Sequence, residues 1–231
     1  MLTETEARAI CHSELNKPDG SWPNKPEIVI TKTQEREHSW VFYYQSRPYI
    51  EQGDLAQALF GSGPFVMLKA GGRFALTAAF PQPGQGISAA EVWLVTNGTS
   101  GSDAVIGPES ADGGPRVNYN CVSCTYATLQ RLSGLDPAAV ATQKGIGRYD
   151  GLGPFAAMGF FLTTSPPAVV EEMLRAGHGA ARPLIIELPE NILHVITVTN
   201  KNGTVHFLDL QTEKIVTLKP DTPVRLARPV H

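Results

Sequence analysis

The sequence has few cysteines, few charged residues and no long apolar run, and each of these features excludes a class of protein. Only three of its 231 residues are cysteines, an odd and small number that does not form a disulfide framework and favours a reducing compartment. Charged residues make up 18% of the chain and its net charge is −3, so it lacks the basic footprint of nucleic-acid-binding proteins. No apolar run approaches the roughly 18 residues that a membrane-spanning helix needs.

The N-terminus has neither the basic region nor the apolar region of a signal peptide. We therefore expect a cytoplasmic protein, or one delivered by a secretion system, with no nucleic-acid or membrane partner. Apolar residues reach 42% of the sequence, which is enough for a packed core, and 22 glycines and 18 prolines indicate many loops. The length allows one large or two small domains.

Two of the three cysteines lie together in the segment Asn120–Cys124, at the start of a predicted helix. The helix is indicated by apolar residues at helical spacing, Leu129 and Leu132, and Gly134 marks its end. The partial positive charge at a helix N-terminus stabilises a thiolate, so a thiol placed there is a candidate nucleophile. The alternative is a buried structural cysteine.

A second pattern, further along the chain, predicts a β-hairpin. Two stretches rich in β-branched residues, 193–199 and 204–210, flank Asn202 and Gly203, and an Asn-Gly pair is the strongest short-range hairpin signal. The loop has either two residues, Asn202 and Gly203, or four. The loop length matters because it decides which residues of the two strands face each other.

Both loop lengths bring a histidine and an acid to the same face of the hairpin. With two loop residues, His194 faces Gln211 and Asp209 is its diagonal neighbour; with four, His194 faces Asp209 directly. A carboxylate beside an imidazole fixes its tautomer and stabilises its cation. Taken singly, His194 could be a hydrogen-bonded strand histidine and Asp209 a surface acid at a strand end.

A cysteine at a helix start, a histidine on a strand and an aspartate on the next strand resemble the arrangement of papain-like thiol hydrolases. Residues 115–215 more narrowly resemble the papain-fold toxin domains of bacterial polymorphic toxin systems, which are often described as glutamine deamidases. The resemblance rests on Asn120–Cys124, Ala127, Leu129, Gly134, His194-Val195 and the run from Gly203 to Thr212. It implies that Cys121 is the nucleophile, His194 the general base and Asp209 the residue that orients His194.

Several site assignments have alternatives at this point. The pattern Cys-Gly-Ser-Cys of papain would make the second cysteine, Cys124, the nucleophile, whereas thiol hydrolases with an Asn-Cys helix start use the first. No glutamine lies just upstream to stabilise an oxyanion, so the backbone N–H of the nucleophile with Asn118 or Asn120 is the available substitute. Asn120 and Gln211 are the predicted supporting residues.

The first part of the chain resembles a second family. Residues 4–95 are similar to the immunity protein 35 (YrhB-like) domain, and the resemblance implies a small α+β binding module without chemistry of its own. It rests on an opening helix, Ile28–Ile30, Trp40–Arg47, Tyr49, Ala58–Pro64 and Gly71-Gly72. One face of the aromatic strand is expected to be half-buried, and the other, with Val41 and Tyr43, is a candidate partner surface. The polar run Thr31–Glu37 predicts a turn.

Together these patterns predict an α+β protein with an immunity-like module at 1–96, a linker at 97–114 and a papain-like domain at 115–231. The papain-like domain would pack its nucleophile helix on an antiparallel sheet and contact the module. The expected function is a papain-like cysteine hydrolase that acts on amide bonds of a protein substrate, as a glutamine deamidase or a peptidase, in a toxin–immunity system. We expect no cofactor and no metal.

Two other functions are compatible with the sequence. The first is a non-catalytic immunity or binding protein built on a papain-like scaffold. The second, more remote, is a zinc-dependent deaminase, because His12-Ser13-Glu14 and Cys121-x-x-Cys124 imitate the His-x-Glu and Cys-x-x-Cys signature of those enzymes. The wide gap between the two motifs and the absence of a proline before Cys121 argue against it.

Overall fold

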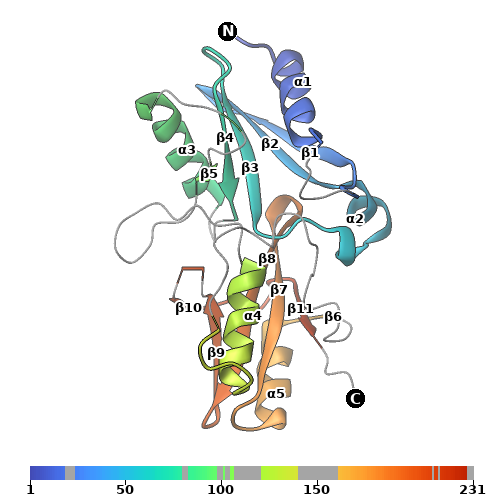
Figure 1. Cartoon of the computed structure of the whole chain (residues 1–231), viewed down its shortest axis with the longest axis vertical. Helices are drawn as coiled ribbons and strands as arrows, with labels where there is room; N and C mark the ends of the chain where they lie inside the picture. Colours follow the sequence, from blue (N-terminus) through green and yellow to red (C-terminus); the bar gives the residue numbers. More distant parts are fainter. Residues whose placement is uncertain are drawn as a thin grey trace.

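The structure is a computed structural model that describes residues 1–18, 24–79, 83–97, 101, 105–106, 121–139, 161–209, 211–212 and 214–227. Its described elements form two sheets with helices packed on them, which confirms the predicted α+β class (Figure 1). Within the two sheets the described strands pair antiparallel, apart from the parallel pair of β4 with β5. No helix among the described residues is long and apolar enough to cross a membrane.

The N-terminal sheet has five strands in the order β1-β2-β3-β4-β5. The strands are β1 (Ile28–Glu35), β2 (Ser39–Ser46), β3 (Ser62–Leu68), β4 (Phe74–Ala78) and β5 (Val105–Ile106). Two helices cover it, α1 (Glu4–Leu15) on one face and α3 (Pro83–Asn97) on the other. The helix α1 begins with a capping box of Thr3 and Glu6, in which each residue's side chain bonds the other's backbone N–H.

The β2 strand is buried on both faces, which corrects one expectation. Trp40, Phe42 and Tyr44 pack under α1, while Val41 and Tyr43 pack under α3. The face with Val41 and Tyr43 is therefore part of the core and not a partner surface. The sequence did not reveal this because α3, with its many small residues, has too little apolar periodicity to be predicted as a helix.

Three further elements differ from the sequence-based expectation. The strand β1 continues to Glu35, so the predicted turn at Thr31–Glu37 is wrong: as an edge strand, β1 pairs on one side with β2 and tolerates polar residues. A short helix, α2 (Arg47–Gln52), follows β2 directly and precedes the 3-10 turn η1 (Leu55–Gln57). The strand β5 lies within the segment predicted as a linker, and the domain boundaries remain a prediction.

The C-terminal sheet has six strands in the order β10-β9-β8-β7-β11-β6. The strands are β6 (Phe161–Thr164), β7 (Ala181–Leu188), β8 (Ile192–Lys201), β9 (Thr204–Asp209), β10 (Lys214–Val216) and β11 (Val224–Ala227). One face carries α4 (Cys121–Leu132) and the other carries α5 (Pro166–Ala176). The central strands β7 and β8 are largely buried on both faces, because each face is covered by a helix.

The two sheets meet at the start of β8, just after the 3-10 turn η4 (Pro189–Asn191). There Phe60 forms a parallel bridge with Leu193, and the N–H of Gly61 donates to the Leu193 carbonyl at 2.7 Å. Phe60 also belongs to the apolar cluster between α4 and the C-terminal sheet. The N-terminal half therefore contributes side chains to the core of the C-terminal half.

The close approach of β3 to β4 at Gly63 yields a test of the fold. A Cβ at this position would lie 2.2 Å from the carbonyl oxygen of Ala78, so Gly63→Ala must displace backbone. We expect it to lower the free energy of unfolding by at least about 2 kcal/mol. Gly84→Ala in α3 is the matched control, because nothing lies within 4 Å of its Cβ. Thermal unfolding that ranks the two variants equally would contradict the described β3–β4 pairing.

Candidate active site

The first residue of α4 is Cys121, so its thiol lies at the helix N-terminus as the sequence predicted. The helix is fixed on the sheet by buried Val122 and Leu129, and by the hydroxyl of Thr125, which donates to the carbonyl of Val195 at 3.2 Å. Gly134, with φ of 73°, follows the helix as expected for a C-terminal stop. These contacts place Cys121 beside the first residues of β8.

The β8–β9 hairpin has the shorter of the two predicted loops. Asn202 and Gly203 both have positive φ, 54° and 81°, which is the geometry of a type I′ turn. Thr197 pairs with Leu208, which is the register of a two-residue loop, and it puts Asp209, the last residue of β9, on the diagonal from His194; Gln211 lies in the turn that follows. The two-residue loop is therefore correct and the four-residue alternative is wrong.

His194 and Asp209 form a buried ionic contact. The Nε2 atom of His194 lies 3.2 Å from Oδ2 of Asp209, and the two residues are only 4% and 2% exposed. The angle is not that of a hydrogen bond, and within the described part of the chain neither ring nitrogen of His194 has a well-aligned partner. The other oxygen of Asp209, Oδ1, accepts the backbone N–H of Gln211 at 3.0 Å. This leaves Nδ1 as the ring nitrogen available to a thiol.

The charges of His194 and Asp209 stabilise each other. Burial by itself lowers the pKa of His194, but the charge of Asp209 and the contact with Cys121 outweigh it and raise the pKa to about 10. For Asp209, burial acts to raise the pKa, but the charge of His194 and bonds from Thr212 and Gln211 lower it overall. At neutral pH the pair is therefore an imidazolium beside a carboxylate.

The predicted site residues differ in how they lie relative to His194 and Asp209. Cys121 is the thiol whose contact raises the pKa of His194, whereas Cys124 lies one turn further along α4 and is half-buried. Gln211 is buried next to Asp209 and holds its carboxylate. Asn118 and Asn120 lie outside the described residues.

The sequence predicted a contact between the two halves but not the residues of the N-terminal half that lie at this site. Tyr49, Ala58 and Phe60 belong to the same apolar cluster as Cys121. Phe60 lies in the segment Ala58–Pro64, which carries the family resemblance, but no local pattern indicates that it reaches a thiol so distant in sequence. In the described part of the chain, no group of three or more His, Cys, Asp and Glu residues is placed to hold a metal ion.

Comparison with known proteins identifies the first part of the chain. Residues 5–96 match the family model described as Immunity protein 35. The chain thus carries an immunity protein 35 domain, as its N-terminal sequence predicted, and this domain points to a toxin–immunity system. The match does not reach the C-terminal sheet. No curated protein and no solved structure gave a significant match.

The ionic contact predicts a measurable change in the titration of His194. Asp209→Asn removes the charge that opposes the effect of burial, so the pKa of His194 should fall from about 10 to below its ordinary value of 6.5. Titration of the histidine ring protons by NMR measures this shift. Asp221→Asn, at an exposed turn, is the control with the same charge change. A His194 that still titrates near pH 10 in Asp209→Asn would contradict the described pairing.

The same pair predicts how stability depends on pH. The contribution of His194, whose pKa is raised, is full below pH 6.5 and is lost as the pH rises through about 10. The contribution of Asp209, whose pKa is lowered, is full above pH 3.8 and is lost as the pH falls through the lowered value. The free energy of unfolding, measured with urea, should therefore fall less at alkaline pH in Asp209→Asn than in the wild type, because the variant lacks the contribution of the raised His194 pKa.

Proposed function

We propose that the C-terminal half is a papain-like cysteine hydrolase of a toxin–immunity system, and that it acts on amide bonds, most directly as a protein glutamine deamidase. The observation that carries this proposal is the contact of a helix-start thiol, Cys121, with the buried His194–Asp209 pair. The start of α4 and the β8–β9 hairpin, which are far apart in the sequence, meet there. Such an arrangement is the general signature of an activated nucleophile with its base and an orienting acid.

The first half-reaction is acylation of Cys121. Its thiolate attacks the carbonyl carbon of the amide, and the carbonyl electrons move to the oxygen to give a tetrahedral intermediate. His194, an imidazolium at neutral pH, donates its proton to the amide nitrogen as the C–N bond breaks. Ammonia leaves if the substrate is a glutamine side chain, and a thioester on Cys121 remains.

Hydrolysis of the thioester completes the cycle. His194, now neutral, takes a proton from water, and the hydroxide attacks the thioester carbonyl. The C–S bond breaks, a glutamate side chain is released, and the thiolate beside the imidazolium is restored. Asp209 keeps the imidazole oriented throughout, because its own carboxylate is held by the backbone N–H of Gln211.

A non-catalytic binding protein on the same scaffold is the second candidate function. The observation that favours it is the burial of Cys121, which is only 1% exposed and so is inaccessible to a substrate in this conformation. The immunity protein 35 match also belongs to a family named for immunity and not for catalysis. A direct assay distinguishes the two functions.

The assay is conversion of glutamine to glutamate in proteins. The full chain is incubated with a bacterial protein extract, and deamidated peptides are identified by mass spectrometry. Cys121→Ala should lower the yield by about a thousandfold or more, because the nucleophile is lost. Cys124→Ala is the matched control, because Cys124 is a neighbouring thiol on the same helix. It should retain activity, because the thiol in contact with His194 is that of Cys121.

Each other outcome changes the assignment. Activity lost in Cys124→Ala and kept in Cys121→Ala would transfer the nucleophile to Cys124. New peptide ends in place of glutamate would identify a peptidase. If neither product depends on either cysteine, the non-catalytic function is correct.

A further inference from the structure

The thiol site is closed in this structure. Cys121, His194 and Asp209 are all buried, and the apolar cluster around Cys121 contains residues from both halves of the chain. A hydrolase whose nucleophile is covered must open before a substrate reaches it. The question is which segment moves.

The cover on the N-terminal side is the segment Gly53–Gly61, which we call the lid. Asp54, Ala56 and Gln57 are half-buried or exposed, whereas Ala58 and Phe60 belong to the cluster that contains Cys121 and the half-buried Leu55 packs against it. The lid has no regular structure beyond the single turn η1. It is thus a short irregular segment with one polar and one apolar side.

Each end of the lid is a glycine in the left-handed region. Gly53 has φ of 69° and ends α2, and Gly61 has φ of 72°. Gly61 is held on both sides, since its carbonyl accepts from Ala79 N–H and its own N–H donates to Leu193, each at 2.7 Å. Gly53 has open space around its Cβ position. The lid is therefore fixed to both sheets at Gly61, and at Gly53 its N–H is bonded to the Tyr49 carbonyl of α2 at 2.8 Å.

One buried side chain binds the middle of the lid. Gln45 is 1% exposed and lies at the end of β2. Its Oε1 accepts from the N–H of Leu59 at 2.6 Å, and its Nε2 donates to the Leu59 carbonyl at 3.1 Å. Leu59 thus has both backbone groups bound by one amide, and its side chain packs in the N-terminal core with α1.

The same amide reaches the strand that carries His194. Nε2 of Gln45 also donates to the carbonyl of Asn191, at 3.2 Å, immediately before β8 begins. Asn191 and Glu190 both have positive φ, 62° and 65°, a conformation that costs free energy in residues other than glycine. Nζ of Lys32, on strand β1 of the N-terminal sheet, lies 2.5 Å from Oε1 of Glu190. Gln45 thus joins the lid to the turn before β8, in addition to the backbone contacts of Phe60 and Gly61 with Leu193.

We propose that Gly53–Gly61 is an autoinhibitory lid over Cys121 and that Gln45 is its latch. The immunity-like half then keeps the thiol inaccessible until the lid swings away from α4, with Gly61 as the pivot. This proposal rests on the proposed function only in taking Cys121 as the residue that needs access. Its test measures accessibility and therefore does not require a substrate.

The decisive variant is Gln45→Glu. The introduced carboxylate has nearly the same shape and still accepts from Ser46 N–H and Leu59 N–H, but it cannot donate to the carbonyls of Leu59 and Asn191. We expect iodoacetamide to alkylate Cys121 about tenfold faster or more, since each lost hydrogen bond shifts an opening equilibrium by roughly two- to tenfold. Peptide mapping resolves the three cysteines.

The introduced carboxyl also makes the opening depend on pH. Burial raises the pKa of a carboxyl group, and its protonated form donates one hydrogen bond again. The ratio of the Cys121 rates in Gln45→Glu and the wild type should therefore shrink as the pH is lowered. A variant that only loosened the fold would not show this dependence.

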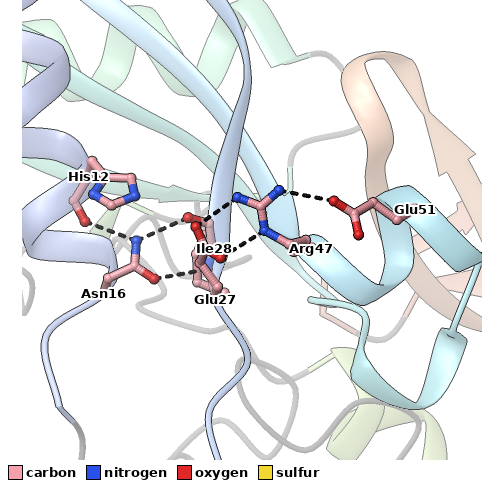
Figure 2. A network of polar contacts seen from close by, with 6 residues as sticks. All are labelled: His12, Asn16, Glu27, Ile28, Arg47 and Glu51. Atoms are coloured by element: carbon pink, nitrogen blue, oxygen red, sulfur yellow. Dashed lines mark hydrogen bonds and ion pairs between the residues drawn. The ribbon is translucent and has the colours of Figure 1, made fainter.

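Two internal references separate opening of the lid from loss of the fold. Cys11 is buried in the N-terminal core, and burial raises its pKa, so it should stay unreactive in every folded variant. Asn16 is the matched control residue, because its amide binds the N–H and carbonyl of Ile28 as Gln45 binds those of Leu59 (Figure 2). Asn16→Asp should leave the Cys121 rate unchanged.

A second variant keeps the proposal testable if Gln45→Glu does not fold. Phe60→Leu shortens the lid side chain that packs with Cys121 and introduces no charge. It should also raise the Cys121 rate while Cys11 stays protected. The lid is ruled out if either folded variant alkylates Cys121 no faster than the wild type, or if Asn16→Asp gives the same increase.

Adding His194→Ala to Gln45→Glu distinguishes failure of the lid from failure of the proposed function. A rate that rises with Gln45→Glu and falls again in the double variant supports both. A rate that rises equally with and without His194 supports the lid and contradicts the activated thiol. If Gln45→Glu has no effect, the lid fails while the deamidation assay still decides the proposed function.

Discussion

The site depends on the burial of a charged pair. A carboxylate and an imidazolium taken out of water lose hydration, and only a close partner and well-placed polar groups compensate for the loss. Asp209 and His194 meet this condition at 3.2 Å, with the backbone of Gln211 as a further donor. The short turn at Asn202-Gly203 sets the register that brings them together, and α4 then adds the thiol. A one-residue slip of that register would move one partner to the opposite face of the sheet and leave the other buried alone.

The immunity protein 35 domain and the C-terminal sheet share part of their cores. Phe60 and Tyr49 fill the cluster under α4, and Gln45 fastens the turn before β8. Because the two halves share this apolar cluster, moving one half away exposes apolar surface of the other, which costs free energy. The N-terminal domain is thereby connected to the thiol by a short chain of contacts, Gln45 to Leu59 to Phe60.

The same contacts relate the two candidate functions. A closed thiol site with an ionised His194–Asp209 pair has the charges that catalysis needs and lacks the access. A decayed enzyme retained as a scaffold would have no reason to keep a charged pair in an apolar interior, since apolar residues of similar size are as stable or more stable there. This physical cost favours the hydrolase over the non-catalytic protein.

The sequence by itself determined the local elements and part of the site. The Asn-Gly turn, the capping box of α1, the glycine after α4 and the alternation that joins His194 to Asp209 are all short-range signals, and the structure has each of them. It did not determine α3, β5 or the true length of β1, whose residues have weak or polar patterns and are ordered by the partners they pair with. Nor did it determine that Phe60 and Gln45 reach the site. Contacts between residues far apart in the chain depend on how the two sheets pack, and no local periodicity encodes that packing.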